Sequence, residues 1–308
     1  MAKSSYRGTL LREKVITVKT IYLDIFFGIS GDMTLAALVD AGVDPDDLRG
    51  ELDRLNLEGW GLSFERITEK GIGATRATVS ADDHHHSHAH GHGMKPGELM
   101  EIIDASDLSD SVKRRSQDII GLVAEAEATV HRIPVDEIHF HELGGIDTVI
   151  DVVGAVVAFD LLDAQAIYCS SIPLSHGYVD MAHGRLPVPV PAVVEILKGH
   201  PTRPLDVDGE TVTPTGAAIA VGMADGFGGV PPMTLQESGF GAGHKDFGER
   251  GNLLRVLVGD SQEPVAEGDE QVLLEANIDD MNPELYAPAR AAIFEAGAVD
   301  CWFQPIVM

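Results

Sequence analysis

Five side chains of the kinds that bind divalent metals stand within thirteen residues, in the stretch IHFHELGGIDTVID at 138–151. They are His139, His141, Glu142, Asp147 and Asp151. The two histidines are two residues apart, so in an extended backbone they project to the same side. Imidazole and carboxylate ligands together suit a first-row divalent ion such as nickel, zinc, manganese or iron. The stretch therefore predicts a metal site built from His139, His141, Asp147 and Asp151.

The two aspartates stand at the start of an almost wholly apolar helix predicted over 147–163. Asp147 is placed to act as the N-cap of this helix, and that local role is the alternative to a chemical one. Asp151 lies one turn further on, where an unpaired buried carboxylate would be costly. We therefore expect a cation, an arginine or a ligand beside Asp151.

A second group of possible metal ligands is the internal run DDHHHSHAHGHG at 82–93, which holds six of the 13 histidines. Its low apolar content and its glycines predict a mobile loop without a packed face. Such a loop would hold several ions weakly, which suits storage or delivery more than catalysis. The histidines concerned are His84, His85, His86, His88, His90 and His92.

Two glycine-containing helix openings could bind an anion. In the first, FGISGDM at 27–33, the candidates are Gly28, Ser30 and Gly31, and in the second, TPTG at 213–216, they are Thr213, Thr215 and Gly216. Backbone N–H groups at such openings can approach a phosphate at the positive end of a helix. Neither opening has the lysine of a P-loop or the dinucleotide glycine pattern. Ordinary helix capping by Ser30, Asp32 or Thr213 is the alternative.

A turn-rich segment, SHGYVDMAHGR at 175–185, holds His176, His183 and Arg185. The arginine could bind a phosphate or a carboxylate. We take His183 and Arg185 as candidate substrate-binding residues.

Strand and helix signals alternate along the chain, which predicts an α/β domain with a layered mixed sheet. The predicted strands lie at 21–27, within 62–79, at 166–169 and at 234–240. The predicted helices cover 32–41, 45–55, 95–103, 109–130, 147–163, 192–197 and 213–224.

The sequence also predicts where domains meet. Residues 1–20 form an N-terminal extension, 21–262 the main domain, and the acidic stretch EPVAEGDE at 263–270 a linker. Strand 272–278, helix 283–296 and strand 299–306 then form a partial ferredoxin-like βαβ unit at 271–308. We expect the rest of that unit to be missing from the chain.

Composition excludes several classes of function. A formal net charge of −27 disfavours nucleic acid as a partner, and solubility is its simplest explanation. The sequence shows no membrane span and no secretory signal, so we expect a cytoplasmic protein that does not bind a membrane. Cys169 and Cys301 are too few for a disulfide framework or a cysteine zinc site and are interpreted as packing residues.

Several unusual motifs in one order resemble the LarC family, the nickel-insertion proteins of the lactate racemase maturation system. They are YLDIFFGISGDM at 22–33, the histidine-rich run, VDEIHFHELGGID at 135–147, HGRLPVP at 183–189, TVTPTGAA at 211–218 and ANIDDMNPE at 276–284. The resemblance covers nearly the whole chain from about Ile21 onward.

The resemblance implies a nickel chelatase of the lyase class (EC 4.99.1.-). Its substrates would be Ni²⁺ and pyridinium-3,5-bisthiocarboxylic acid mononucleotide, and its product the nickel-pincer cofactor for the apo-enzyme of a lactate racemase-type protein. It also implies assistance by CTP with Mn²⁺ or Mg²⁺, bound in a C-terminal domain inside which this chain ends. We therefore expect CTP binding to need the missing part, which could be a separate chain, and we expect a homo-oligomer. Ile25 stands where the family often has cysteine, which removes a possible thiolate ligand.

The motifs and the resemblance lead to one hypothesis about the site. The openings at Gly28 and Thr213 would hold the phosphate of the mononucleotide. Forming a carbon–nickel bond requires loss of the ring C4 proton, and Glu142, His141 and Asp32 are the candidate bases.

Two other functions stay open at this point. A non-enzymatic nickel or zinc store would depend on the histidine-rich run, so deleting 82–92 would abolish its function. A metal-dependent phosphohydrolase would turn over simple phosphate esters with added metal.

Overall fold

The computed structural model describes residues 15–81, 94–140, 145–181, 184–264, 276, 278, 281–298 and 300–304. The chain divides into two compact units, one of which is Val15–Pro264. The other contains the described residues from 276 onward, and each unit is treated by itself. The histidine-rich run at 82–93 lies outside the described residues.

The unit Val15–Pro264 contains a mixed seven-stranded sheet in the order β2-β3-β10-β11-β1-β4-β9. Strand β1, inside the sheet, pairs antiparallel with β11 and parallel with β4, so both kinds of ladder meet on one strand. The strands are β1 (Val15–Asp24), β2 (Trp60–Glu69), β3 (Ile72–Ala81), β4 (Ala166–Cys169), β9 (Gly226–Phe227), β10 (Met233–Ala242) and β11 (Leu253–Pro264). The predicted α/β fold with a layered mixed sheet is confirmed.

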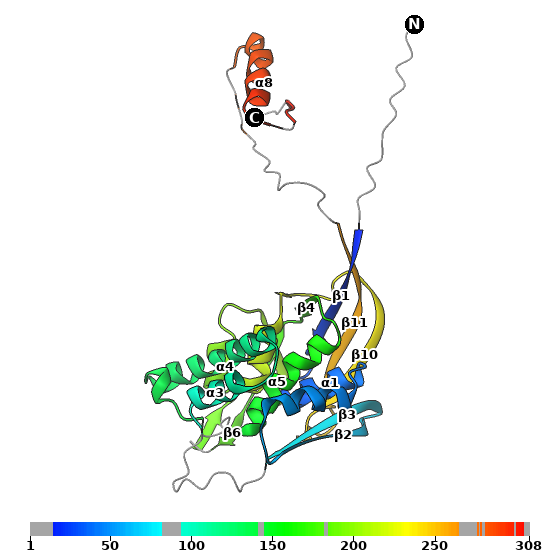
Figure 1. Cartoon of the computed structure of the whole chain (residues 1–308), viewed down its shortest axis with the longest axis vertical. Coiled ribbons are helices and arrows are strands. Elements are labelled where there is room, and N and C mark those ends of the chain that lie inside the picture. The colour runs from blue at the N-terminus through cyan, green and yellow to red at the C-terminus, as the bar shows by residue number, and fades with distance from the viewer. Residues whose placement is uncertain are drawn as a thin grey trace. The chain divides into compact units, whose positions relative to one another are not determined.

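Helices α1, α3, α4 and α5 lie together beside the strands β1, β10 and β11 (Figure 1). Helix α1 packs directly on β10. The two backbones are so close that a Cβ at Gly239 or Gly241 would lie less than 3.0 Å from the backbone of α1. The helices of this unit are α1 (Gly31–Asp40), α2 (Pro45–Leu52), α3 (Pro96–Ala105), α4 (Asp110–His131), α5 (Ile146–Leu161), α6 (Pro191–Ile196) and α7 (Pro214–Met223). Each coincides with a predicted helix to within about three residues.

Twelve of the 16 residues of helix α5 are buried, as its apolar sequence predicts. It packs against α1, α2, α4 and α7, and Gly154 lets it approach Leu35 of α1. This central position matters for the site, because the first turns of α5 carry Asp147 and Asp151.

The sequence did not predict every strand. Strand β11 was missed, and β1 begins at Val15 rather than at 21, because residues 15–20 pair with 259–264 of β11. Residues 263 and 264, assigned to a linker by sequence, therefore belong to β11. Two small sheets were also missed; they pair β5 (Ile172–His176) with β8 (Thr202–Asp208) and β6 (Tyr178–Met181) with β7 (Gly184–Pro187).

The C-terminal unit contains a short 3₁₀ turn, η4 (Pro283–Leu285), and helix α8 (Tyr286–Glu295), which matches the helix predicted at 283–296. The strand predicted at 299–306 is wrong for the described residues 300–304, which have no regular structure. A strand needs a partner for its backbone hydrogen bonds, and the contact there is instead between the rings of Tyr286 and Phe303, 4.8 Å apart. Most of the strand predicted at 272–278 lies outside the described residues.

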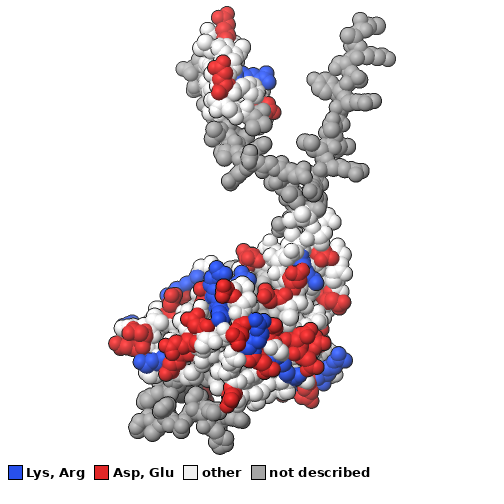
Figure 2. Space-filling view, viewed as in Figure 1, with Lys and Arg blue, Asp and Glu red and all other residues white. Residues whose placement is uncertain are grey.

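Acidic side chains are spread over the face shown in Figure 2, interspersed with basic ones. This fits the net charge of −27. None of the helices in the described part of the chain is both long and apolar enough to cross a membrane.

Candidate functional site

The two glycine-containing openings predicted from sequence lie side by side. Ile29 N donates to Thr211 O at 2.9 Å, and Thr213 N donates to Ile29 O at 3.0 Å. A Cβ at Gly28 would overlap the Thr211 carbonyl, and one at Gly216 would overlap the Ile29 carbonyl, both closer than 3.0 Å. Glycine is therefore required at both positions for the two backbones to approach each other.

The start of α5 lies close to the start of α1. A Cβ at Gly31, the first residue of α1, would lie closer than 3.0 Å to the carboxylate of Asp151 on α5. The N-terminal turns of α1, α5 and α7 thus converge, and each helix contributes the positive end of its dipole. Asp32 and Asp147 stand in the first turns of α1 and α5, where that dipole favours a carboxylate.

The hydroxyls at the openings of α1 and α7 have different partners. Thr213 is the N-cap of α7, and its side chain accepts a hydrogen bond from Gly216 N at 3.1 Å, so the capping interpretation holds there. Ser30 occupies the N-cap position of α1 but makes no capping bond. Its hydroxyl instead donates to the Asp32 carboxylate, so side-chain capping of α1 by Ser30 is wrong.

The carboxyl groups of Asp32 and Asp147 influence that of Asp151. Burial raises the pKa of Asp151 well above its ordinary value, and the charges of Asp32 and Asp147 raise it further. Asp151 Oδ1 is buried and has no hydrogen-bond partner in the part of the chain that the structure describes. The Asp151 carboxyl is therefore held towards its neutral form.

One expectation about these aspartates needs correction. The N-cap position of α5 belongs to Gly145, whereas Asp147 lies within the first turn, so the capping role for Asp147 is wrong. The described charged groups that act on Asp151 are the carboxylates of Asp32 and Asp147. The cation, arginine or ligand expected beside Asp151 stays a prediction.

The sequence analysis missed His244, which lies beside Asp32. The His244 Nε2 atom is 3.5 Å from Asp32 Oδ2 and 3.0 Å from the carbonyl oxygen of Ala77. Its side chain is 54% exposed. His244 belongs to the connection between β10 and β11, GHKDFGERGN at 243–252, a glycine-bounded turn with basic and aromatic residues that could have been singled out.

The next residues of that connection complete the surroundings of the Gly28 opening. The Phe247 ring makes an edge-on contact with Phe27 at a centroid distance of 5.1 Å. The Lys245 ammonium stacks 5.1 Å from the centre of the Phe247 ring. It also lies so close to Gly209 that a Cβ there would meet it. A cationic group and two aromatic rings therefore flank the opening.

The remaining predicted site residues are only partly placed. His139 is half-buried, whereas His141, Glu142, His183 and the six histidines of 84–92 lie outside the described residues. Arg185 stacks on the Tyr178 ring at 4.9 Å, and His176 pairs with Asp206 at 3.1 Å. The described residues contain no group of three or more His, Cys, Asp or Glu side chains arranged to hold a metal ion. The predicted metal site therefore stays a prediction.

Ile25 lies in the core with no exposed surface. Cys169 is equally buried, and burial raises the pKa of its thiol. A buried, protonated thiol is a packing group and not a metal ligand. This agrees with the packing role expected for Cys169.

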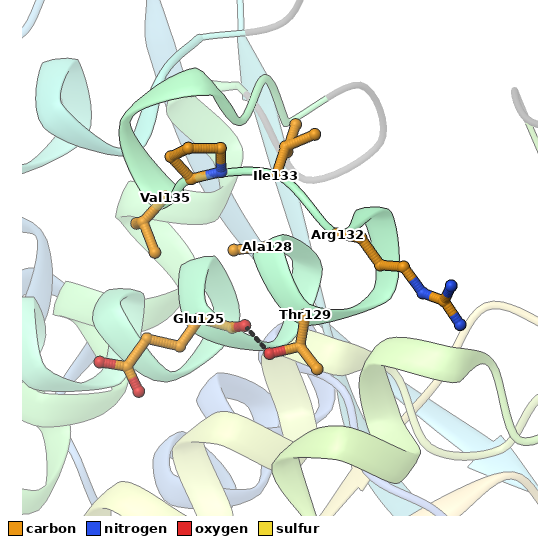
Figure 3. Close-up of a pocket in the computed structure, with 7 residues that line it drawn as sticks. Glu125, Ala128, Thr129, Arg132, Ile133 and Val135 are labelled. Carbon is orange, nitrogen blue, oxygen red and sulfur yellow. Dashed lines mark hydrogen bonds between the residues drawn. The ribbon is translucent and has the colours of Figure 1, made fainter.

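A surface hollow of about 500 Å³ lies at the C-terminal end of α4 (Figure 3). It is lined by Glu125, Ala128, Thr129, Arg132, Ile133, Pro134 and Val135. The hydroxyl of Thr129, which lines the hollow, already donates a hydrogen bond to Glu125 O at 2.9 Å. None of the residues predicted to do chemistry lines this hollow.

Comparison with known proteins identifies the family of the chain. The family model described as nickel insertion protein matches residues 21–308, which includes both openings, the start of α5 and the His244 connection. The chain belongs to the nickel insertion protein family. Membership implies a nickel chelatase activity.

Relatives named for nickel insertion cover most of the chain. A protein of Citrifermentans bemidjiense is 44% identical over 292 residues, which are 94% of this chain and 74% of the relative. One of Geotalea daltonii is 44% identical over 293 residues, 94% of this chain and 73% of that protein. The pyridinium-3,5-bisthiocarboxylic acid mononucleotide nickel insertion protein of Staphylococcus epidermidis is 40% identical, over 94% of this chain and 71% of its own length. No solved structure matched the chain.

Proposed function

We propose that this nickel insertion protein places Ni²⁺ into pyridinium-3,5-bisthiocarboxylic acid mononucleotide to form the nickel-pincer cofactor of lactate racemase-type enzymes. It would then be a chelatase of the lyase class (EC 4.99.1.-). The name of the Staphylococcus epidermidis relative supports this substrate. The observation that carries the proposal is the convergence of the Gly28 and Thr213 openings with Asp32 and Asp151.

The phosphate of the mononucleotide would bind at the paired openings. Backbone N–H groups at the starts of α1 and α7, around Gly31 and Thr215, offer donors and two positive helix ends, and Gly216 lets the two openings approach each other. Lys245 supplies the balancing positive side chain beside Gly209. Gly28 and Ser30 shape the first opening, whereas roles for His183 and Arg185 in substrate binding stay predictions.

The cationic pyridinium ring and the nickel ion would lie against the carboxylates. His139, Asp147 and Asp151 are the described members of the proposed nickel-binding set, which His141 would complete. A neutral Asp151 is a poor ligand until it loses its proton, so binding of Ni²⁺ there releases a proton. The histidines at 84–92 would collect nickel for this site.

The chemistry needs a proton acceptor. Two thiocarboxylate sulfurs of the substrate bind Ni²⁺, the C4–H bond breaks, and its electron pair forms the carbon–nickel bond. The proton passes to a base, and the nickel is neither oxidised nor reduced. Asp32, His141 and Glu142 are the bases that the sequence predicts, and Asp32 is the described one.

CTP with Mn²⁺ or Mg²⁺ would bind outside Val15–Pro264. The described residues 281–298 and 300–304 contain one basic residue, Arg290, whose guanidinium stacks on Phe294 at 5.4 Å. That set does not fit a triphosphate, so we assign no step to CTP. A cytoplasmic location, a homo-oligomer, a separate C-terminal chain and transfer to a nickel-pincer apo-enzyme stay predictions.

The test is nickel insertion by the purified chain, supplied with NiCl₂, the bisthiocarboxylate mononucleotide, CTP and Mg²⁺. Mass spectrometry should detect a product heavier by nickel minus the displaced protons, and His141→Ala should form less of it. Nickel bound by the protein without any change in the mononucleotide would favour storage. Phosphate release from simple esters, with the mononucleotide left intact, would favour a phosphohydrolase. Either result would overturn the proposal.

A further inference from the structure

We propose that His244 is the base that accepts the C4 proton of the pyridinium ring, and that Asp32 positions it. The inference rests on the proposed function and deepens it. It assigns the proton-transfer step to a residue of the β10–β11 connection rather than to the stretch 138–151.

The hydrogen bonds of His244 define which ring nitrogen can act. Nε2 lies 3.0 Å from the carbonyl oxygen of Ala77, and a carbonyl can only accept a hydrogen bond. Nε2 therefore carries the hydrogen, so Nδ1 of the neutral ring keeps its lone pair. Nδ1 has no hydrogen-bond partner within the described residues, and the side chain is exposed enough to meet a substrate.

Asp32 is held near the same atom, His244 Nε2. Its Oδ1 accepts the hydrogen bond from Ser30, and its Oδ2 faces His244 Nε2 at 3.5 Å. A carboxylate in this position orients the imidazole and stabilises the positive charge that the ring gains with a proton.

Two comparisons favour His244 over Asp32 as the acceptor. Both oxygens of Asp32 already face partners, and its side chain is 22% exposed against 54% for His244.

The step balances without an oxidant or reductant. The C4–H bond breaks, its electron pair forms the bond to Ni²⁺, and the proton moves to Nδ1. Asp32 and Ala77 O then hold the imidazolium through Nε2–H. Water removes the proton once the product has left.

The experiment measures single-turnover nickel insertion by the full chain with Ni²⁺, CTP and Mg²⁺, at several concentrations of the mononucleotide. His244→Gln keeps a side-chain donor for Ala77 O but cannot accept the proton. We expect the rate at saturation to fall about 100-fold or more, with the apparent affinity for the mononucleotide changed less than about threefold. Deuterium at ring C4 should slow the variant further, because proton removal then limits the rate.

Two further variants sharpen the result. His131→Gln is the matched control, since His131 Nε2 also lies 3.4 Å from a carboxylate, that of Glu127, on α4. It should insert nickel at the wild-type rate. The double variant His244→Gln with Asp32→Asn should be no slower than His244→Gln alone, because residues that act as one unit are not additive.

Three outcomes would overturn the inference. The first is a His244→Gln rate close to that of His131→Gln, and the second is a loss confined to mononucleotide affinity. The third is a double variant slower by the product of the two single effects, which would make Asp32 an independent base. A wild-type chain that inserts no nickel would instead overturn the proposed function, and the inference with it.

Discussion

The openings of α1 and α7 are alike in sequence and lie against each other, yet their hydroxyls have different partners. Thr213 caps its own helix through Gly216 N, whereas Ser30 leaves α1 without a side-chain cap and donates to Asp32. The Thr213 hydroxyl thus stabilises the fold, and the Ser30 hydroxyl fixes a carboxylate that faces His244. The two openings therefore have different roles: the one at Thr213 stabilises the backbone, and the one at Ser30 orients groups that could react.

The largest effect is expected from Asp32→Asn. The amide lacks the charge that stabilises a protonated His244, so the insertion rate should fall about 100-fold. The unfolding temperature should change little, because Asp32 is partly exposed. Single-turnover assays would measure the rate, with Asp46→Asn on the exposed start of α2 as the control for losing one carboxylate. An Asp32→Asn rate within threefold of the wild type would remove the α1 opening from the chemistry.

A substitution at the contact between the two openings should lower the stability of the fold more than one on an exposed helix face. Gly216→Ala places a Cβ against the Ile29 carbonyl, and backbone cannot yield as a flexible side chain does. We expect a loss of about 1–3 kcal/mol in the free energy of unfolding, measured in urea.

The control is Gly121→Ala in α4, where an added Cβ meets nothing within 4 Å. It should leave stability unchanged or raise it by up to about 1 kcal/mol. Equal stability of the two alanine variants would show that the openings are not in close contact.

Sequence alone could identify both openings and the apolar helix behind them. Period and capping signals are local, so the bounds of α1, α5 and α7 were close to those observed. The pairing of Ile29 with Thr211 joins residues about 180 positions apart, and no local pattern reports it. The residues His141 and Glu142 stay untested.

His244 was missed for a related reason. Strand β11 was not predicted, so nothing indicated that the chain returns beside β1 and brings 243–252 next to Asp32. The approach of Asp32 to Asp151 was also missed, because sequence shows spacing and not distance. Burial and the two neighbouring carboxylates favour the neutral acid of Asp151.

The buried Asp151 carboxyl predicts how the stability of the fold changes with pH. Because the pKa of Asp151 is raised in the folded chain, folding favours its protonated form, and that contribution is complete below the unfolded pKa. It is lost as pH rises towards the folded pKa, with a slope of at most about 1.4 kcal/mol per pH unit.

Asp151→Asn removes this titration. In metal-free buffer, wild-type stability should therefore fall relative to that of the variant as pH rises from about 4 upwards. Urea unfolding of both proteins across that range measures the difference, and parallel stability curves would contradict the account.

The smallest effects should distinguish the two hydroxyls directly. Thr213→Ala should lose about 1 kcal/mol of stability, as expected for an N-cap, whereas Ser30→Ala should lose only a few tenths. Ser30→Ala should instead slow insertion several-fold by freeing Asp32. A larger loss of stability in Ser30→Ala than in Thr213→Ala would contradict the different roles assigned to the two hydroxyls.

The central claim is that the paired openings hold the substrate with its ring towards His244. A crystal structure of the chain with the bisthiocarboxylate mononucleotide tests it most directly. The account predicts the phosphate at the N-terminal turns of α1 and α7 beside Lys245, and ring C4 within hydrogen-bonding reach of His244 Nδ1. A mononucleotide bound elsewhere, for example in the hollow at the end of α4, with the openings empty, would contradict it.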